Sequence, residues 1–337
     1  MQPAIIVAGN KIKPGQHTTV RVPVARLYTY NEMAMPVHVV HGRREGPRLF
    51  LCGAIHGDEI IGTEVIRRLM KLKRLNSITG TLLAVPVVNI YGFLQQSRYS
   101  PDRRDLNRFF PGSEKGSLTS QLADIVMKEV IQGSTHGIDL HAGSNHRANL
   151  PQIRADIGNP ETLRLSKAFK VPVIINSKTR EGSLRHAAVA MGVTTLLYES
   201  GEVLRFDEIA IRAGVRGVLS VMEALGMLKA KRSGNSDIDP LIADTTSWVR
   251  APVSGILRML VPLGGRVTKN SKIGVIADPF GGEEREVRSP VSGMVIGRLN
   301  LPLVHQGDAV IHIAHLHRLT GIAPIIEEFR EEITEDS

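Results

Sequence analysis

The sequence predicts an α/β protein in which a mostly parallel mixed sheet carries helices on both faces and a small all-β domain follows. Two observations indicate this architecture. Between about residues 47 and 228, apolar runs of strand length alternate with segments of helical period, which is typical of right-handed β–α–β connections. After residue 246, short β segments carry an internal repeat. We place the first domain at residues 1–235 and the second at 246–320.

Each element of the first domain follows from its local pattern. Residues 1–46 are rich in β-forming residues, and we expect them to pair as antiparallel strands at one side of the sheet. Residues 48–55 form an apolar run of strand length, whereas 62–75 place their apolar residues on one helical face. By the same criteria, further strands are expected at 80–89, 137–143, 171–177 and 193–200, and further helices at 117–131, 159–170, 183–192 and 207–228.

The pattern changes after Leu228. Residues 229–247 are polar and predict a linker. Beyond it, the motif Pro-Val-Ser-Gly occurs at 252–255 and again at 290–293, each time followed by a glycine-containing turn and an apolar strand. Two copies of one β unit favour a small barrel or sandwich at about 246–315.

Composition argues against several classes of protein. Hydrophobic residues make up 42% and charged residues 22% of the chain, which describes an ordinary globular protein. No apolar run reaches the roughly 18 residues that a membrane span needs, and the N-terminal residues lack the pattern of a signal peptide. The single cysteine, Cys52, is expected to be buried and allows no internal disulfide. We therefore expect a cytoplasmic protein that contacts no membrane.

The formal net charge of +9 raises the question of nucleic-acid binding. Against it, aromatic residues make up only 4% of the chain, and Lys and Arg are scattered among acids. A basic pocket for a small anion explains the arginines equally well, so we expect no nucleic-acid partner. The acidic stretch 327–337 is expected to be a frayed, solvated end, although 322–333 also has the pattern of a short helix.

Three side chains at the ends of predicted strands could hold a metal. His56 and Glu59 lie in the turn after the first strand, and His141 follows "GIDL" in another. In open parallel sheets this carboxyl edge is where ligands bind. Two imidazoles and one carboxylate are a known catalytic zinc set that leaves a position for water. Taken singly, each histidine is more simply a buried, hydrogen-bonded residue, and Asp139 either orients His141 or is an ordinary satisfied strand residue.

A metal-activated water needs a general base, and Glu199 is the candidate. It ends the predicted strand "VTTLLYES" after a run without charge, and so would reach the same edge of the sheet. Helix capping is the alternative role for this carboxylate. Glu202 is the nearby competitor, which we expect to be solvated.

A loop rich in arginine, "QQSRYSPDRRDLNRFFPG", is the candidate substrate-binding segment. A guanidinium matches a carboxylate in bidentate fashion and an amide can add a donor, which favours Arg98, Asn107 and Arg108. Arg103 and Arg104 are more simply a solvated face of the loop. The Phe-Phe-Pro sequence that follows is expected to anchor the loop.

At these residues the chain resembles the succinylglutamate desuccinylase/aspartoacylase family, a branch of the zinc carboxypeptidase-like fold. The similarity covers about residues 37–228. It rests on an ordered series of motifs, namely "GAIHGDE", "VNIYGFLQQSR", "DLNRFFPG", "DLHAG", "EGSLRHAA" and "LLYESGE".

The resemblance implies one Zn²⁺ per chain. It implies that the metal ligands are His56, Glu59 and His141, and that Glu199 acts as general base and acid. It further implies that Arg98 polarises the scissile carbonyl and stabilises the oxyanion. Asn107 and Arg108 would bind a carboxylate of the substrate.

The C-terminal repeat is similar to biotinyl/lipoyl barrel-sandwich domains, which members of this family also carry. The hairpin "IADPFGGEEREV" has no lysine, so we expect an unmodified domain. Aspartoacylases enclose their substrate with a tyrosine from this domain. Here no tyrosine follows Tyr198, so the lid of the pocket must differ. No role can be assigned to Arg147, Arg154 or Arg180, which lie in segments near the expected site.

The sequence therefore favours a zinc-dependent amidohydrolase that deacylates a small, carboxylate-bearing N-acyl amino acid or a related amide. The alternatives are a metallocarboxypeptidase acting on peptides, a deacylase for a modified osmolyte or amine, and a non-catalytic metal-binding protein of the same fold. A homo-oligomer is compatible with the sequence.

Overall fold

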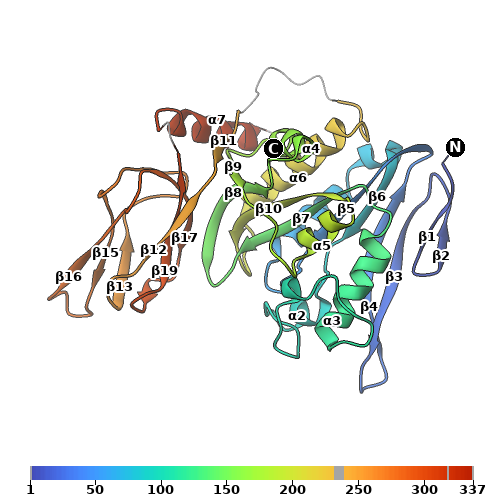
Figure 1. Ribbon diagram of the computed structural model, residues 1–337, viewed down its shortest axis with the longest axis horizontal. Helices are drawn as coiled ribbons and strands as arrows, with labels where there is room; N and C mark the ends of the chain where they lie inside the picture. The colour runs from blue at the N-terminus through green and yellow to red at the C-terminus, as the bar shows by residue number, and fades with distance from the viewer. Residues whose placement is uncertain (1, 231–238, 317–318, 336–337) are drawn as a thin grey trace.

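The computed structural model describes residues 2–230, 239–316 and 319–335. Its centre is a 13-stranded mixed sheet that continues from the N-terminal strands into the C-terminal part of the chain (Figure 1). Along the main path the strands are, in order, β12 (Thr246–Arg250), β19 (Ala309–His315), β17 (Gly293–Leu299), β8 (Arg147–Ala155), β10 (Thr194–Glu202), β7 (His136–Gly143), β5 (Arg44–Gly53), β6 (Thr79–Val85), β4 (Glu32–His41) and β3 (His17–Arg26). Off this path lie β9 (Val173–Asn176), β11 (Leu241–Ala243) and β14 (Arg266–Val267).

The expected mixed sheet with helices is confirmed, but parallel pairing dominates only its centre. The central run β10-β7-β5-β6 is parallel throughout, and β9 pairs in parallel with β8 and β11. Both flanks are antiparallel. The expectation of a mostly parallel sheet was wrong chiefly because the sequence does not predict a strand at β8. That strand carries Arg147, Asn149, Gln152 and Arg154 among its apolar residues, and it pairs antiparallel with both β10 and β17.

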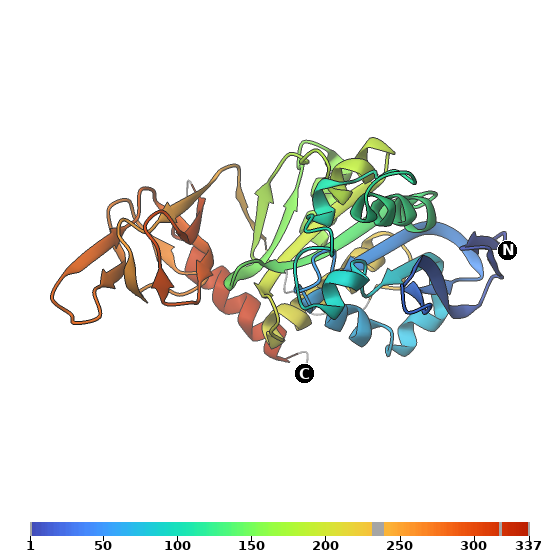
Figure 2. The same ribbon diagram turned by 90° about the horizontal axis from the view of Figure 1, so that it is seen from below.

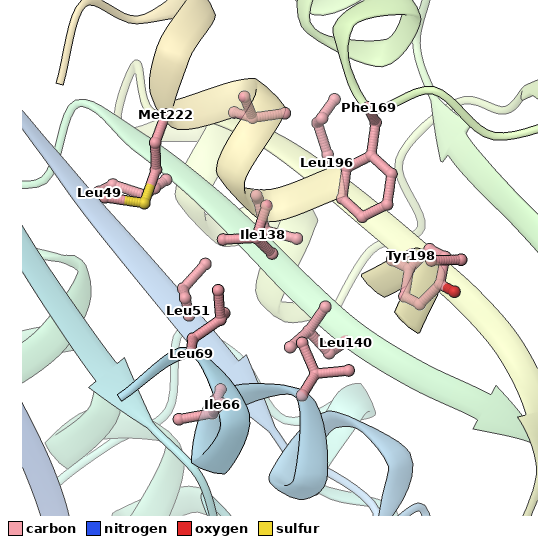
Figure 3. Close-up of a cluster of buried hydrophobic side chains, with 14 of the residues drawn as sticks. Leu49, Leu51, Ile66, Leu69, Ile138, Leu140, Phe169, Leu196, Tyr198 and Met222 are labelled. Carbon is pink, nitrogen blue, oxygen red and sulfur yellow. The ribbon is translucent and has the colours of Figure 1, made fainter. Parts of the chain in front are cut away.

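Helices cover both faces of the sheet, as the sequence predicts. Leu49 and Leu51 point to one face, where they join the buried residues of α1 (Ile61–Leu69), α4 (Pro160–Ala168) and α6 (Glu208–Ala224). Figure 3 shows part of this cluster, with Ile138 and Leu140 of β7 between the helices. Phe50 and Cys52 point to the other face, against α2 (Ile90–Leu94), α3 (Leu118–Val126) and α5 (Leu184–Ala190). The alternation of one strand between two buried faces explains its unbroken apolar sequence.

Helix ends fall where capping residues permit them. Asp207 accepts a hydrogen bond from the Ala210 backbone N–H at the start of α6, and Asn159 does the same for Glu161 and Thr162 at the start of α4. Short segments complete the part of the chain at residues 2–230, here called the N-terminal region: β1 (Ile5–Val7), β2 (Asn10–Ile12), the 3₁₀ turns at Lys73–Ser77 and Leu106–Arg108, and a π-helical turn at Met127–Ile131.

Residues 246–315, here called the C-terminal β region, contain the predicted repeat. The final glycines of its two copies, Gly255 and Gly293, begin the strands β13 and β17. A four-stranded sheet packs with β12, β14, β17 and β19 around a separate apolar cluster. Its strands are β16 (Glu284–Arg288), β15 (Lys272–Ala277), β13 (Gly255–Met259) and β18 (Leu303–Val304). The barrel-sandwich assignment and the domain limits stay predictions, because β17 pairs directly with β8 and joins this region to the large sheet.

Two expectations about the connecting and terminal segments were wrong. Within the expected linker, 231–238 lie outside the described residues, but β11 pairs in parallel with β9, so the remainder is not all linker. The acidic tail is not frayed over its described part, because α7 (Ile322–Glu335) buries Phe329 and Ile333 in the main core. Figure 2 shows this helix between the C-terminal β region and the main sheet. Among the described helices, none has the length and apolar character needed to cross a bilayer.

Candidate metal centre and its pocket

The three predicted metal ligands meet at the ends of β5 and β7. His56 Nδ1 lies 2.7 Å from Glu59 Oε1, and His141 Nδ1 lies 2.8 Å from Glu59 Oε2. All three side chains are buried, and one ligand atom from each lies within 4.8 Å of the others. Gly57 lets the turn pass against α2, because a Cβ there would fall 1.9 Å from the backbone carbon of Gly92. The cluster can therefore hold a metal ion.

A second carboxylate faces each imidazole from behind. His56 Nε2 lies 3.1 Å from Asp105 Oδ1, and His141 Nε2 lies 2.8 Å from Asp139 Oδ2. A carboxylate can only accept, so each Nε2 carries its hydrogen, and Nδ1 is the nitrogen through which each imidazole would bind a metal. Asp139 thus makes the contact expected of an orienting residue. Asp105 was missed, although its place two residues before Asn107 in "DLNR" was a usable signal.

The charges of the cluster suit a cation. Burial disfavours the charged imidazoles, but Glu59 and Asp105 outweigh it at His56, and Asp139 and Glu59 outweigh it at His141, so both pKa values are raised. Burial would raise the pKa of Glu59, yet the two imidazoles hold it well below its ordinary value. The charge of Glu59 therefore stabilises positive charge beside the two Nδ1 atoms. A divalent ion would supply that charge, and two histidines with one glutamate are a donor set that fits zinc.

Glu199 lies in the same pocket as the cluster and on the strand next to His141. Asn149 Nδ2 donates a 2.9 Å hydrogen bond to Glu199 Oε2. Burial raises the pKa of Glu199, whereas the nearby Arg154 lowers it. Glu202 is not the solvated residue that we expected. It is buried, and it accepts a 2.8 Å hydrogen bond from Asn300 Nδ2 outside the residues that line the pocket.

The three predicted substrate-binding residues also line this pocket. Arg98 donates to Glu59 Oε1 at 3.1 Å and to Asp105 Oδ2 at 2.9 Å. Burial alone would lower the pKa of Arg98, but these two carboxylates outweigh burial and raise the pKa above its ordinary value, so Arg98 stays a cation. Asn107 Oδ1 accepts from the Leu184 backbone N–H at 2.8 Å, which leaves its Nδ2 as the group that could bind a ligand. Arg108 lies beside it and donates to the Asn107 carbonyl.

The pocket has a volume of about 440 Å³ and is strongly basic. Two carboxylates, Glu59 and Glu199, face seven basic side chains. These are Arg98, Arg108, Arg147, Arg154, Lys178, Arg180 and Arg185. The three arginines without an assigned role therefore belong to the pocket lining. Such an excess of positive charge attracts anions.

The C-terminal β region contributes Trp248 to the pocket wall. Its ring stacks on His312, with ring centres 4.2 Å apart and planes 5° apart, and the Arg147 guanidinium lies 5.3 Å from its centre. The sequence correctly indicates that no C-terminal tyrosine can enclose the site. It gave no reason to single out Trp248, although this is the chain's only tryptophan.

Comparison with known proteins finds similarity over the part of the chain that contains the pocket residues of the main sheet. Residues 45–225 match the model of the succinylglutamate desuccinylase/aspartoacylase catalytic domain. The N-alpha-acetyl-L-2,4-diaminobutyric acid deacetylase of Halomonas elongata is 30% identical over 167 residues, which are 48% of each chain. The matched segment thus spans about half of that relative.

Solved structures are similar over most of the chain. A succinylglutamate desuccinylase from Silicibacter sp. TM1040 has a TM-score of 0.79 at 23% identity and covers 90% of this chain and 95% of its own. The product-bound ectoine utilization protein EutE (DoeB) from Ruegeria pomeroyi has a TM-score of 0.79 at 25% identity, with 89% and 94% covered. Both similarities extend through the C-terminal part of the fold.

Proposed function

The chain belongs to the succinylglutamate desuccinylase/aspartoacylase family, and we propose that it is a zinc-dependent amidohydrolase that deacylates a small, carboxylate-bearing N-acyl amino acid or a related amide. One observation carries this proposal. The cluster of His56, Glu59 and His141 shares one basic pocket with the carboxylate of Glu199. The deacetylase and desuccinylase names of similar proteins support an amide as substrate.

In the proposed reaction, His56, Glu59 and His141 would hold a zinc ion, which would lower the pKa of the attacking water and polarise the substrate carbonyl. Glu199 accepts a proton from the attacking water and returns it to the departing amine. Arg98 directs its guanidinium at the oxygen on which negative charge develops, a contribution of about 3 kcal/mol in comparable sites. Asp105 holds Arg98 and His56 in their relative positions through its two carboxylate oxygens.

The lining charges support an anionic substrate. Asn107 Nδ2 and Arg108 would bind a carboxylate of the amino acid, and the further arginines of the pocket would attract a second negative group. The relative from Halomonas elongata is named for a substrate whose side chain carries an amine. The ammonium of such a side chain would face seven basic side chains here, so we propose an acidic side chain or acyl group instead.

The test is turnover by the zinc-loaded protein of N-acetyl, N-succinyl and N-formyl derivatives of aspartate, glutamate and 2,4-diaminobutyrate. We expect the acidic amides to be hydrolysed with the higher kcat/KM. The Glu199→Gln variant should keep its zinc and lose at least about 99% of kcat. Zinc-loaded protein that hydrolyses none of these amides would contradict the proposal, and N-blocked dipeptides in the same panel test the metallocarboxypeptidase alternative.

A further inference from the structure

The carboxylate of Glu199 is held by a single neutral side chain. Asn149 lies on β8, is 8% exposed, and donates from Nδ2 to Glu199 Oε2 at 2.9 Å. In the described part of the chain, this carboxylate accepts no other hydrogen bond. The contact thus fixes Oε2 of a carboxylate that lines the pocket. A neutral amide also supports the ionised carboxylate without adding a charge that would pair with it.

Asn149 lies where the N-terminal region, residues 2–230, meets the C-terminal β region. In the backbone register, it is opposite Gly201 of β10 on one side and opposite Gly297 of β17 on the other. Strand β8 therefore connects Glu199's own strand to the repeat-containing region. The position of the amide depends on both neighbours.

Gly297 provides the space that the amide occupies. A Cβ at position 297 would lie 2.9 Å from Asn149 Oδ1 and 3.2 Å from His312 Cβ. The nearest atom is the end of a side chain and not backbone, so the amide can move aside while the sheet stays intact. A methyl group at this position would thus displace Asn149 from Glu199.

We propose that Asn149 is a positioning residue for Glu199 and that Gly297, in the C-terminal β region, keeps the Asn149 amide in place. This inference rests on the proposed role of Glu199 as the general base. It gives the C-terminal β region a part in the reaction, because β17 supplies the surface against which the amide is seated. A base whose rotation is fixed needs less reorganisation to reach its proton.

The chain offers matched controls for both residues. Asn300 donates from Nδ2 to Glu202 Oε2 at 2.8 Å, which is the same chemistry outside the pocket. Gly274 is a strand glycine of the C-terminal β region at which a Cβ would meet no atom closer than 3.3 Å. Asn300→Ala and Gly274→Ala should both leave kcat within about twofold of the wild type.

The experiment measures kcat, KM and zinc content with the best substrate of the N-acyl amino acid panel. We expect Asn149→Ala to lower kcat by about 10- to 100-fold, with KM within about twofold and zinc retained. Gly297→Ala should lower kcat by roughly 3- to 10-fold. If Gly297 acts through Asn149, the double variant should be no slower than Asn149→Ala alone, because the two changes remove one contact.

The outcomes separate this inference from the function on which it rests. Wild-type kcat in Asn149→Ala, with Glu199→Gln inactive, would overturn the positioning role and leave the base assignment intact. Normal turnover by Glu199→Gln would overturn the base itself. Independent, additive losses in the double variant would overturn the role of Gly297. So would a crystal structure of Gly297→Ala that keeps Asn149 Nδ2 within hydrogen-bond distance of Glu199 Oε2, and this readout needs no substrate.

Discussion

Glu199 and His141 are register partners on the neighbouring parallel strands β10 and β7. Backbone hydrogen bonds of the sheet therefore hold the proposed base level with a proposed metal ligand. Strand β5, which leads to His56 and Glu59, pairs with β7 from the other side. The four side chains thus project from one rigid edge of the sheet, which suits a reaction that depends on their separation.

Asp105 should contribute strongly to metal affinity, although it would act through the ligand His56 and not on the metal itself. It accepts contacts from His56, Arg98 and the Asn107 backbone N–H. In Asp105→Asn, an NH₂ group must face either the His56 N–H or the Arg98 guanidinium, so we expect zinc affinity to fall by about 10- to 100-fold. Chelator competition measures this. Asp102→Asn is the control, since Asp102 lies in the same loop as Asp105 but accepts hydrogen bonds from Thr119 of α3. An equal loss of zinc affinity in both variants would contradict the role of Asp105.

Zinc affinity should weaken as the pH falls. The pKa values of His56 and His141 are raised by their carboxylate partners, so both imidazoles hold protons to higher pH than the ordinary value of about 6.5. Below those raised values a metal must displace protons, and its apparent affinity therefore rises with pH until the imidazoles are neutral. Calorimetry in buffers of different ionisation enthalpy should detect proton release on zinc binding. Affinity that is constant between about pH 6 and 8 would be inconsistent with this account.

Arg154 should set the acid side of the pH profile. Glu199 must be ionised to accept a proton, and Arg154 lowers the pKa that burial raises. Arg154→Met removes this cation, so the pKa of Glu199 rises and the acidic limb of kcat/KM moves to higher pH. Arg180→Met removes another pocket cation and should leave the limb in place. If the acidic limb of kcat/KM lies at the same pH in both variants, Arg154 does not act on Glu199.

Trp248 should affect substrate binding more than chemistry. It forms the pocket wall contributed by the C-terminal β region, stacks on His312 and has the Arg147 guanidinium over its ring. We expect Trp248→Ala to raise KM roughly fivefold with a smaller change in kcat, because an aromatic contact of this kind contributes about 1 kcal/mol. Trp248→Phe should recover most of the loss. A pure loss of kcat with unchanged KM would argue that Trp248 does not contact the substrate.

The sequence alone predicted those site residues whose local motif indicates both their place at the sheet edge and the chemistry of their side chains. His141 and Glu199 lie near the ends of β7 and β10, and His56 and Glu59 lie in the turn after β5. The topology of such an α/β sheet brings strand ends to one edge. The structure gathers them there, together with Arg98. Their roles remain proposals that rest on this geometry.

The residues that the sequence did not reveal act through contacts between distant segments. Asn149 lies on β8, which also supplies Arg147 and Arg154 to the pocket and whose polar residues make its sequence resemble a solvated loop. Trp248 enters from a β region that looks like a separate domain, and it reaches the site because β17 pairs with β8. Asp105 lies within a recognised motif, but its two partners come from elements 49 and 7 residues away. Local hydrophobic periodicity does not predict such contacts between distant segments of the chain.

Anomalous diffraction at the zinc absorption edge, from crystals of the zinc-loaded protein, tests the central claim most directly. We expect one strong peak at about 2.0–2.2 Å from His56 Nδ1, His141 Nδ1 and a carboxylate oxygen of Glu59. Glu199 should face the same ion from across the pocket. A peak held by other residues, or none at this cluster in protein that contains stoichiometric zinc, would contradict the account.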